Sequence, residues 1–236
     1  MKKMSRSAVE LSIRCERCFV LSYKHRIRPP HIPFTLNLAV DNLCKNEFDF
    51  YRKKQEKHPL FIENNLDAIP FDHPDIDAWR SFKKGGIGFQ DEEKGFKFYG
   101  LIDDVWIKPD GELIIADYKA TSKKKFDWEY THQQPWGEAY ERQLEMYQWL
   151  FRKNGFDVAN EAYLVYYNGL KHEEAFNNQL KFESYWIEVK GDDSWVESAI
   201  IHAKNLLEDN RFPKPSKTCE QCNYLRKRWN LSQGIS

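Results

Sequence analysis

The sequence predicts a mixed α/β domain in which helices flank a mixed central sheet. Hydrophobic residues make up 41% of the 236 residues and charged residues 31%, a composition typical of a globular protein. Two observations predict the fold class. Apolar residues follow helical spacing early and late in the chain, and between these parts, over Phe96–Lys119, they alternate with period two. Because helical and strand patterns interleave along the chain, an α/β arrangement is favoured.

The first ninety residues are predicted to contain two helices followed by a mostly irregular segment. We expect one helix over Ser7–Tyr23, ended before Pro29 and Pro30, since proline is unfavourable inside a helix. A second helix is predicted over Leu36–Lys54, where apolar residues fall on one broad face. The segment His58–Gly88 is rich in proline and glycine, so we expect it to be mostly irregular, with room for one short helix.

A β-hairpin is predicted next. Phe96–Lys108 alternates as a strand, Pro109-Asp110-Gly111 has the residues of a tight turn, and Glu112–Lys119 forms the second strand. Apolar residues occupy both faces of this second strand, which predicts a central, buried position in the sheet.

The later elements alternate again between helix and strand. A helix is predicted over Trp136–Asn154, followed by strands over Ala162–Tyr167 and Tyr185–Val189 and a helix over Ser194–Leu207. The chain has no internal repeat and no Gly/Ser-rich linker, so we expect a single domain over residues 1–236.

Charge and hydropathy exclude some classes of protein. No apolar stretch reaches the roughly 20 residues that a membrane span needs, and the basic N-terminus lacks the apolar segment of a signal peptide. We therefore expect a cytoplasmic protein without a membrane partner. The 36 basic and 36 acidic residues balance, so net charge does not indicate nucleic-acid binding. Two local basic runs, Lys123–Lys125 and Leu225–Trp229, are on charge alone interpreted as solvated surface.

Charged side chains end the second hairpin strand. Side chains alternate along a strand, so Asp117 and Lys119 share one face with Leu113 and Ile115. Burying a single charge is costly, and the pair makes a partly buried position tolerable. The pattern fits either a plain ion pair at a strand end or a catalytic pair.

A second carboxylate strengthens the catalytic interpretation. Asp103 and Asp104 lie on the first hairpin strand, which the turn folds back beside Asp117. Neighbouring carboxylates are the oxygen ligands that a divalent cation such as Mg²⁺ requires. Asp103 and Asp104 point to opposite faces, and periodicity does not decide which one faces Asp117.

Four cysteines form two Cys-x-x-Cys pairs at opposite ends of the chain. Cys15 and Cys18 lie near the start, and Cys219 and Cys222 near the end. Such pairs predict a four-thiolate metal site joining a terminal subregion made of residues 1–35 and 210–236, and their local spacing favours zinc. The fifth cysteine, Cys44, lies on an apolar helix face and is interpreted as a packed core residue.

Three motifs resemble one nuclease family over most of the chain, from Ser5 to Cys222. Gly100-x-x-Asp103, Asp117-Tyr118-Lys119 and Gln143-x-x-x-Tyr147 are similar to the RecB-like branch of the PD-(D/E)XK nucleases. That branch includes AddB nuclease domains and CRISPR-associated RecB-like exonucleases. The resemblance implies a restriction-endonuclease-like core and Mg²⁺- or Mn²⁺-dependent hydrolysis of phosphodiester bonds in DNA, in repair, recombination or defence.

The resemblance also implies roles for individual residues. Asp103 and Asp117 would be metal ligands together with the Tyr118 carbonyl, and Lys119 would position and polarise the attacking water. Gln143 and Tyr147 would lie beside the active site and the DNA strand. Where the branch often has a metal-binding histidine, this sequence has Asp41, a carboxylate that can replace imidazole for Mg²⁺ or Mn²⁺.

For the cysteines, the resemblance and the local spacing favour different metals. Many members of the branch hold a [4Fe–4S] cluster with one early and three late cysteines. Cys15, Cys219 and Cys222 match that pattern, Arg228 stands at the fourth position, and Cys18 would supply the missing thiolate. The resemblance favours [4Fe–4S] and the spacing favours Zn²⁺. We expect the [4Fe–4S] cluster, with Zn²⁺ as the alternative, and in both cases the role is structural.

Two other classes of function compete with the nuclease hypothesis. One is a non-catalytic nucleic-acid-binding module that retains the nuclease fold, and the other is a protein–protein scaffold stapled by its metal site. The complete set of Asp103, Asp117 and Lys119 favours the enzyme, because a degenerate copy would be expected to lose Lys119 first.

Overall fold

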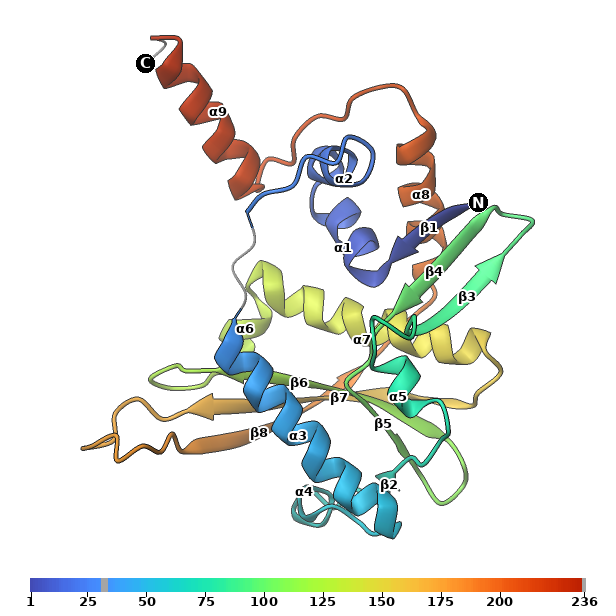
Figure 1. Ribbon diagram of the computed structural model, residues 1–236, viewed down its shortest axis with the longest axis vertical. Helices are drawn as coiled ribbons and strands as arrows, with labels where there is room; N and C mark the ends of the chain where they lie inside the picture. Colours follow the sequence, from blue (N-terminus) through green and yellow to red (C-terminus); the bar gives the residue numbers. More distant parts are fainter. Residues whose placement is uncertain (31–33, 235–236) are drawn as a thin grey trace. The chain divides into compact units, whose positions relative to one another are not determined.

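The computed structural model describes residues 1–30 and 34–234 and shows a mixed α/β protein, as the sequence predicts (Figure 1). Its contacts divide the chain into two compact units. Residues 1–31, 90–98 and 195–236 form what we call the terminal unit, and residues 32–89 and 99–194 form the central unit.

The central unit is built on a five-stranded mixed sheet of order β2-β5-β6-β7-β8. The hairpin strands β5 and β6 are antiparallel, with Asp104 opposite Ala116. β6 runs parallel to β7, with Asp117 opposite Leu164, and β7 and β8 are antiparallel. As predicted, β6 is central, and residues 113–118 are all buried. The strands are β2 (Ile69–Pro70), β5 (Asp104–Ile107), β6 (Leu113–Thr121), β7 (Val158–Gly169) and β8 (Phe182–Lys190).

Two long helices pack against opposite faces of β6. Tyr118 lies against Phe48 of α3, with ring centroids 5.3 Å apart, whereas Asp117 on the other face bonds Gln143 of α7. Both helices match their predicted ranges closely, although the predicted apolar face of α3 is only partly buried: Cys44 and Phe48 are buried, whereas Leu36 and Leu43 are exposed. The helices of this unit are α3 (Thr35–Lys54), α4 (Pro59–Glu63), α5 (Ile76–Trp79), α6 (Trp128–His132) and α7 (Pro135–Lys153).

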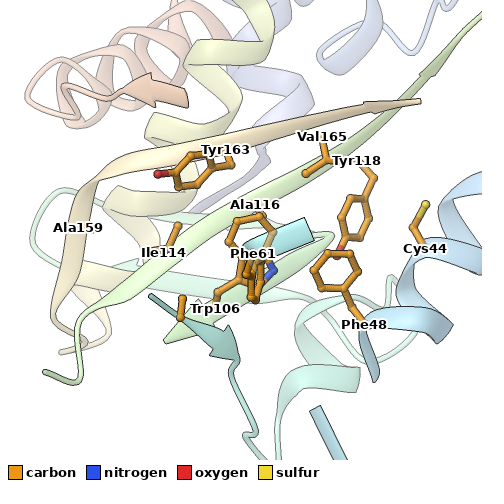
Figure 2. Close-up of a cluster of buried hydrophobic side chains, with 11 residues drawn as sticks. Cys44, Phe48, Phe61, Trp106, Ile114, Ala116, Tyr118, Ala159, Tyr163 and Val165 are labelled. Carbon is orange, nitrogen blue, oxygen red and sulfur yellow. The ribbon is translucent and has the colours of Figure 1, made fainter. Parts of the chain in front are cut away.

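The core between α3 and the sheet is strongly aromatic (Figure 2). Phe48 stacks on Trp106, and Phe61 meets Trp106 edge to face at 4.6 Å. Cys44 is buried in the same cluster, which agrees with its interpretation as a core residue. This packing fixes α3, and therefore the polar side chains along its edge, against β6.

The terminal unit combines both ends of the chain with the tip of a hairpin (Figure 1). Its helices are α1 (Arg6–Arg14), α2 (Glu16–Tyr23), α8 (Val196–Glu208) and α9 (Glu220–Ser232). Strand β1 (Lys2–Ser5) joins a second sheet of order β1-β4-β3. The hairpin of β3 (Ile87–Asp91) and β4 (Phe96–Gly100) carries the chain from the central unit into the terminal unit and back.

Some predicted elements need correction. The single strand expected over Phe96–Lys108 is two strands in different sheets, so Asp103 lies in a bend directly before β5. The helix expected over Ser7–Tyr23 is interrupted at Cys15, which is extended (φ −162°, ψ 103°). The segment His58–Gly88 is mostly irregular, as expected, but it contains two short helices, where one was expected, and strand β2. Helix α9, in the C-terminal tail, was not predicted.

Membrane insertion finds no support in the helices. Among residues 1–30 and 34–234, no helix combines the length and apolar character that a bilayer span requires.

Candidate active site and metal centre

The polar cluster of the central unit is centred on Asp117, near the end of the buried half of β6. Asp117 is 1% exposed, and one of its oxygens pairs with the Lys119 ammonium on the same strand face. Its other oxygen accepts a hydrogen bond of 2.6 Å from the Gln143 amide of α7. Strand alternation therefore places Asp117 and Lys119 together, and helix α7 adds Gln143 to this pair.

Asp103 is the second carboxylate of this cluster. It lies close enough to Asp117 to influence the pKa of that carboxyl, and its Oδ2 accepts a hydrogen bond from the Tyr118 main-chain N–H at 3.1 Å. Its Oδ1 is 2.9 Å from the Lys45 ammonium. The bend before β5 thus turns the Asp103 side chain toward the end of β6.

The electrostatics of these carboxylates follow from their burial and neighbours. Burial and the adjacent Asp103 raise the pKa of Asp117 to about 7, although Lys119 opposes the shift. Burial alone would raise the pKa of Asp103, but Lys45 and Lys119 hold it below its usual value. Burial and Asp103 raise the pKa of Asp41. The pKa of Lys119 is raised, because Asp117 and Asp103 outweigh its burial, so Lys119 stays an ammonium at neutral pH.

Lys45 is a member of the cluster that sequence reasoning missed. Its ammonium lies 2.8 Å from Asp41 Oδ2 and 2.9 Å from Asp103 Oδ1, and so bridges two of the predicted metal ligands. The available signal was the spacing: Asp41 and Lys45 are four residues apart on one helix and therefore share a face.

Asp104, the neighbour of Asp103, has entirely different surroundings. It is fully buried, and Oδ1 accepts hydrogen bonds from Arg80 at 2.8 Å and from Arg52. The Tyr118 hydroxyl donates to Oδ2 at 2.6 Å. The geometry therefore places Asp103, and not Asp104, with Asp117, which the sequence periodicity left undecided.

The first and last predicted motifs meet at Gly100. The Tyr147 hydroxyl donates to the Leu101 carbonyl and lies 3.3 Å from the Gln143 amide nitrogen. A Cβ atom at Gly100 would lie 2.5 Å from the Tyr147 ring, so only glycine leaves room for this tyrosine. Tyr140, one turn before Gln143, was also missed, and the Lys119 ammonium lies 4.6 Å from the centroid of its ring.

A family comparison shows to which superfamily the chain belongs. Residues 36–226 match the PD-(D/E)XK nuclease superfamily. The chain belongs to that superfamily. Every residue of the cluster, from Asp41 to Tyr147, lies within the matched range.

The similarity to solved structures is weak. A solved structure described as "Crystal structure of SSO0001" is 15% identical to this PD-(D/E)XK protein, with a TM-score of 0.38 over 91% of this chain and 78% of that one. No curated protein matches the chain.

The donor set fits the divalent cation that PD-(D/E)XK nucleases typically use. The carboxylates of Asp103 and Asp117, with Asp41 joined to Asp103 through Lys45, offer the oxygen ligands preferred by Mg²⁺ and Mn²⁺.

The terminal unit of this PD-(D/E)XK protein brings the four predicted cysteines together. The sulfurs of Cys15, Cys18, Cys219 and Cys222 all lie within 4.8 Å of one another, and none is in a disulfide. Cys15 is the N-cap of α2 and Cys219 is the N-cap of α9, so each pair occupies the first turn of a helix. Burial would raise the pKa of Cys15, but N–H groups of Ser216 and Cys18 donate to its sulfur and lower the pKa to about 7.

Proposed function

We propose that this protein is a RecB-like, metal-dependent nuclease that hydrolyses phosphodiester bonds in DNA during repair, recombination or defence. The observation that supports it most is the ion pair of Asp117 with Lys119 at the buried end of β6, with Asp103 close enough to raise the pKa of Asp117. Superfamily membership supports a nuclease, and the choice of DNA and of the RecB-like branch rests on the sequence motifs.

In this proposal Asp103, Asp117 and the Tyr118 carbonyl hold Mg²⁺ or Mn²⁺, which stabilises negative charge on the phosphate when bound. Lys119, held as an ammonium by the two aspartates, donates hydrogen bonds to the attacking water and the phosphate. It does not act as the base, because its pKa is raised above the usual lysine value.

Gln143 and Tyr147 position the reacting groups. The Gln143 amide occupies Asp117 Oδ1, which leaves Oδ2 directed at Lys119. Tyr147 fixes the chain at Leu101, two residues before Asp103. Both side chains are buried, so they hold the carboxylates in a defined geometry before any substrate arrives.

Charge balance favours one divalent cation over two. When ionised, Asp41, Asp103 and Asp117 supply three negative charges, and Lys45 and Lys119 supply two positive charges. A single divalent cation would then leave the site with one net positive charge, which suits a phosphate anion, whereas a second cation would compete with Lys45 for Asp41 and Asp103. We propose that Asp41 is a metal ligand in addition to Asp103 and Asp117. The Lys45 ammonium would then supply part of the positive charge that a second metal ion would provide.

The C-terminal helix is a candidate for contact with the nucleic acid. Residues 214–232 carry five basic side chains and one acidic side chain, although the whole chain carries 36 of each. Arg226, Lys227 and Arg228 on α9 are exposed, as are Tyr224 and Trp229 beside them. Exposed basic and aromatic side chains together suit phosphate contact and base stacking.

One assay tests the proposal. Purified protein is incubated with end-labelled single- and double-stranded DNA, and in parallel with RNA, in Mn²⁺, Mg²⁺ or EDTA. We expect DNA cleavage that requires the metal. Binding without cleavage in every metal would identify a non-catalytic module, and neither binding nor cleavage would point to a scaffold protein.

A further inference from the structure

The four cysteines of the terminal unit carry an inference that does not depend on nuclease activity. From the spacing of their sulfurs, we infer that Cys15, Cys18, Cys219 and Cys222 bind a single zinc ion and not the iron–sulfur cluster that the family resemblance implies. The ion closes the two ends of the chain onto each other, since Cys18 and Cys219 are 201 positions apart.

The sulfurs have the spacing of a tetrahedron around one ion. Zinc–sulfur bonds of about 2.3 Å place four tetrahedral sulfurs about 3.8 Å apart. Here Cys15 and Cys222 are 3.8 Å apart, Cys18 and Cys219 3.5 Å, and Cys18 and Cys222 3.4 Å. All four sulfurs lie within 4.8 Å of one another, so every edge of the tetrahedron is short.

The same distances do not fit an iron–sulfur cluster. In a [4Fe–4S] cluster each thiolate binds a different iron atom, which spreads the sulfurs to on the order of 6 Å. A [2Fe–2S] cluster would keep two sulfurs close on each iron but separate the two pairs. In this protein the short distances of 3.4–3.8 Å run between the early pair and the late pair.

The backbone frames the two pairs in the same way. In each Cys-x-x-Cys, the first cysteine caps a helix and the second is the third residue of that helix. Carbonyls of Cys15 and Cys219 accept equivalent bonds of 3.0 Å from Phe19 and Asn223. Two helix N-termini therefore direct their positive ends toward the thiolates, which offsets the negative charge of a tetrathiolate ion.

The ligand chemistry favours zinc among single ions. Four thiolates fill all four positions of a tetrahedral zinc site, which leaves none for water and gives the centre a structural role. Thiolate sites bind Zn²⁺ more tightly than Fe²⁺, following the general order of divalent metals. Arg228, which stands where the family pattern places its fourth cysteine, lies exposed on α9.

Metal analysis of the intact protein tests the inference. The full chain is purified anaerobically from cells supplied with both iron and zinc, and its metal content is measured together with its visible spectrum. We expect one zinc per chain, no absorbance near 400 nm, and the intense visible bands of a tetrahedral tetrathiolate when Co²⁺ replaces zinc. Iron with acid-labile sulfide, mononuclear iron, or a protein without metal would each overturn it.

Two variants make the assignment specific. Cys18→Ser should lose the zinc and lower the melting temperature, whereas Cys44→Ala, which changes a buried cysteine outside the cluster, should retain one zinc per chain. Asp117→Asn should also retain its zinc, so the result is independent of whether the proposed nuclease site is active. Full zinc content in Cys18→Ser would contradict the four-cysteine assignment.

Discussion

Asp103 and Asp104 are adjacent in the chain but belong to different networks. Asp103 pairs with Lys45 at a partly exposed position and raises the pKa of the nearby Asp117. Asp104 is buried between Arg52, Arg80 and the Tyr118 hydroxyl. Arg80 also donates to the Asp103 carbonyl at 2.8 Å, so the buried network holds the backbone of its neighbour in place.

This difference predicts opposite consequences for two similar substitutions. Asp103→Asn should abolish metal-dependent cleavage with little loss of stability, because Lys45 keeps Asp41 as a partner. Asp104→Asn should lower the free energy of unfolding by about 1–3 kcal/mol, because it removes one of the two carboxylates that pair with Arg52 and Arg80 and leaves only Asp49. Urea denaturation and a cleavage assay on both variants measure the two effects. If Asp103→Asn unfolds and Asp104→Asn only loses activity, the assignment is reversed.

Lys45 leads to a prediction about metal affinity. Replacing its ammonium by the methionine side chain leaves Asp41 and Asp103 without their shared cation, so Lys45→Met should bind Mn²⁺ roughly tenfold more tightly or better. The metal-free variant should melt at a lower temperature and recover on addition of Mn²⁺. Lys53→Met, which removes an exposed lysine from the same helix, is the matched control for calorimetry. Weaker Mn²⁺ binding by Lys45→Met than by the wild type would show that Lys45 supports the metal in another way.

Among the helices and strands, those with regular apolar periodicity in the sequence were predicted well. Helices α3 and α7 and strand β6 were predicted well. The two helices pack buried apolar residues on the sheet, and β6 is buried within it. The interruptions between β4 and β5 and at Cys15 were not predicted. Apolar alternation continues from β4 into β5 although the strands join different sheets, and helical spacing continues through Cys15 although its backbone is extended.

At the candidate site, sequence periodicity likewise predicted some polar contacts and not others. Strand alternation predicted that Asp117 and Lys119 share a face, and they do. The position of Asp103 depends on a bend, and the contact of Lys45 with Asp103 joins residues 58 positions apart, so neither follows from local spacing.

Helix α9 provides a prediction at this scale. If its exposed basic side chains contact phosphates, the combined substitution of Arg226, Lys227 and Arg228 by alanine should weaken binding of labelled single-stranded DNA in EDTA. The log–log dependence of affinity on salt should become shallower by about 0.7 for each lost phosphate contact. Fluorescence anisotropy across a salt series measures both. An alanine variant of the exposed Lys53, Lys83 and Lys84 removes the same charge, and an equal effect of this control would refute a specific role for α9.

In the whole molecule, the candidate active site and the four-cysteine site lie in different units. The central unit contains the carboxylate and lysine cluster, and the terminal unit contains the four cysteines. Loss of the metal from the cysteines should therefore affect stability first, whereas changes at β6 should affect cleavage first. The sequence predicted both clusters, because each is marked by rare, closely spaced residue types. It also predicted a terminal subregion of residues 1–35 and 210–236, but not that residues 90–98 and helix α8 belong to the same unit.

The central claim is that Lys119 and the adjacent carboxylates form a catalytic site and are not a structural ion pair. The most direct measurement is the single-turnover rate of Mn²⁺-dependent DNA cleavage by Lys119→Met beside Lys125→Met, which removes an exposed lysine from the same unit. We predict that Lys119→Met cleaves at least about 100-fold more slowly than the wild type while still binding Mn²⁺, and that Lys125→Met retains its activity. Cleavage by Lys119→Met at the wild-type rate would contradict the account.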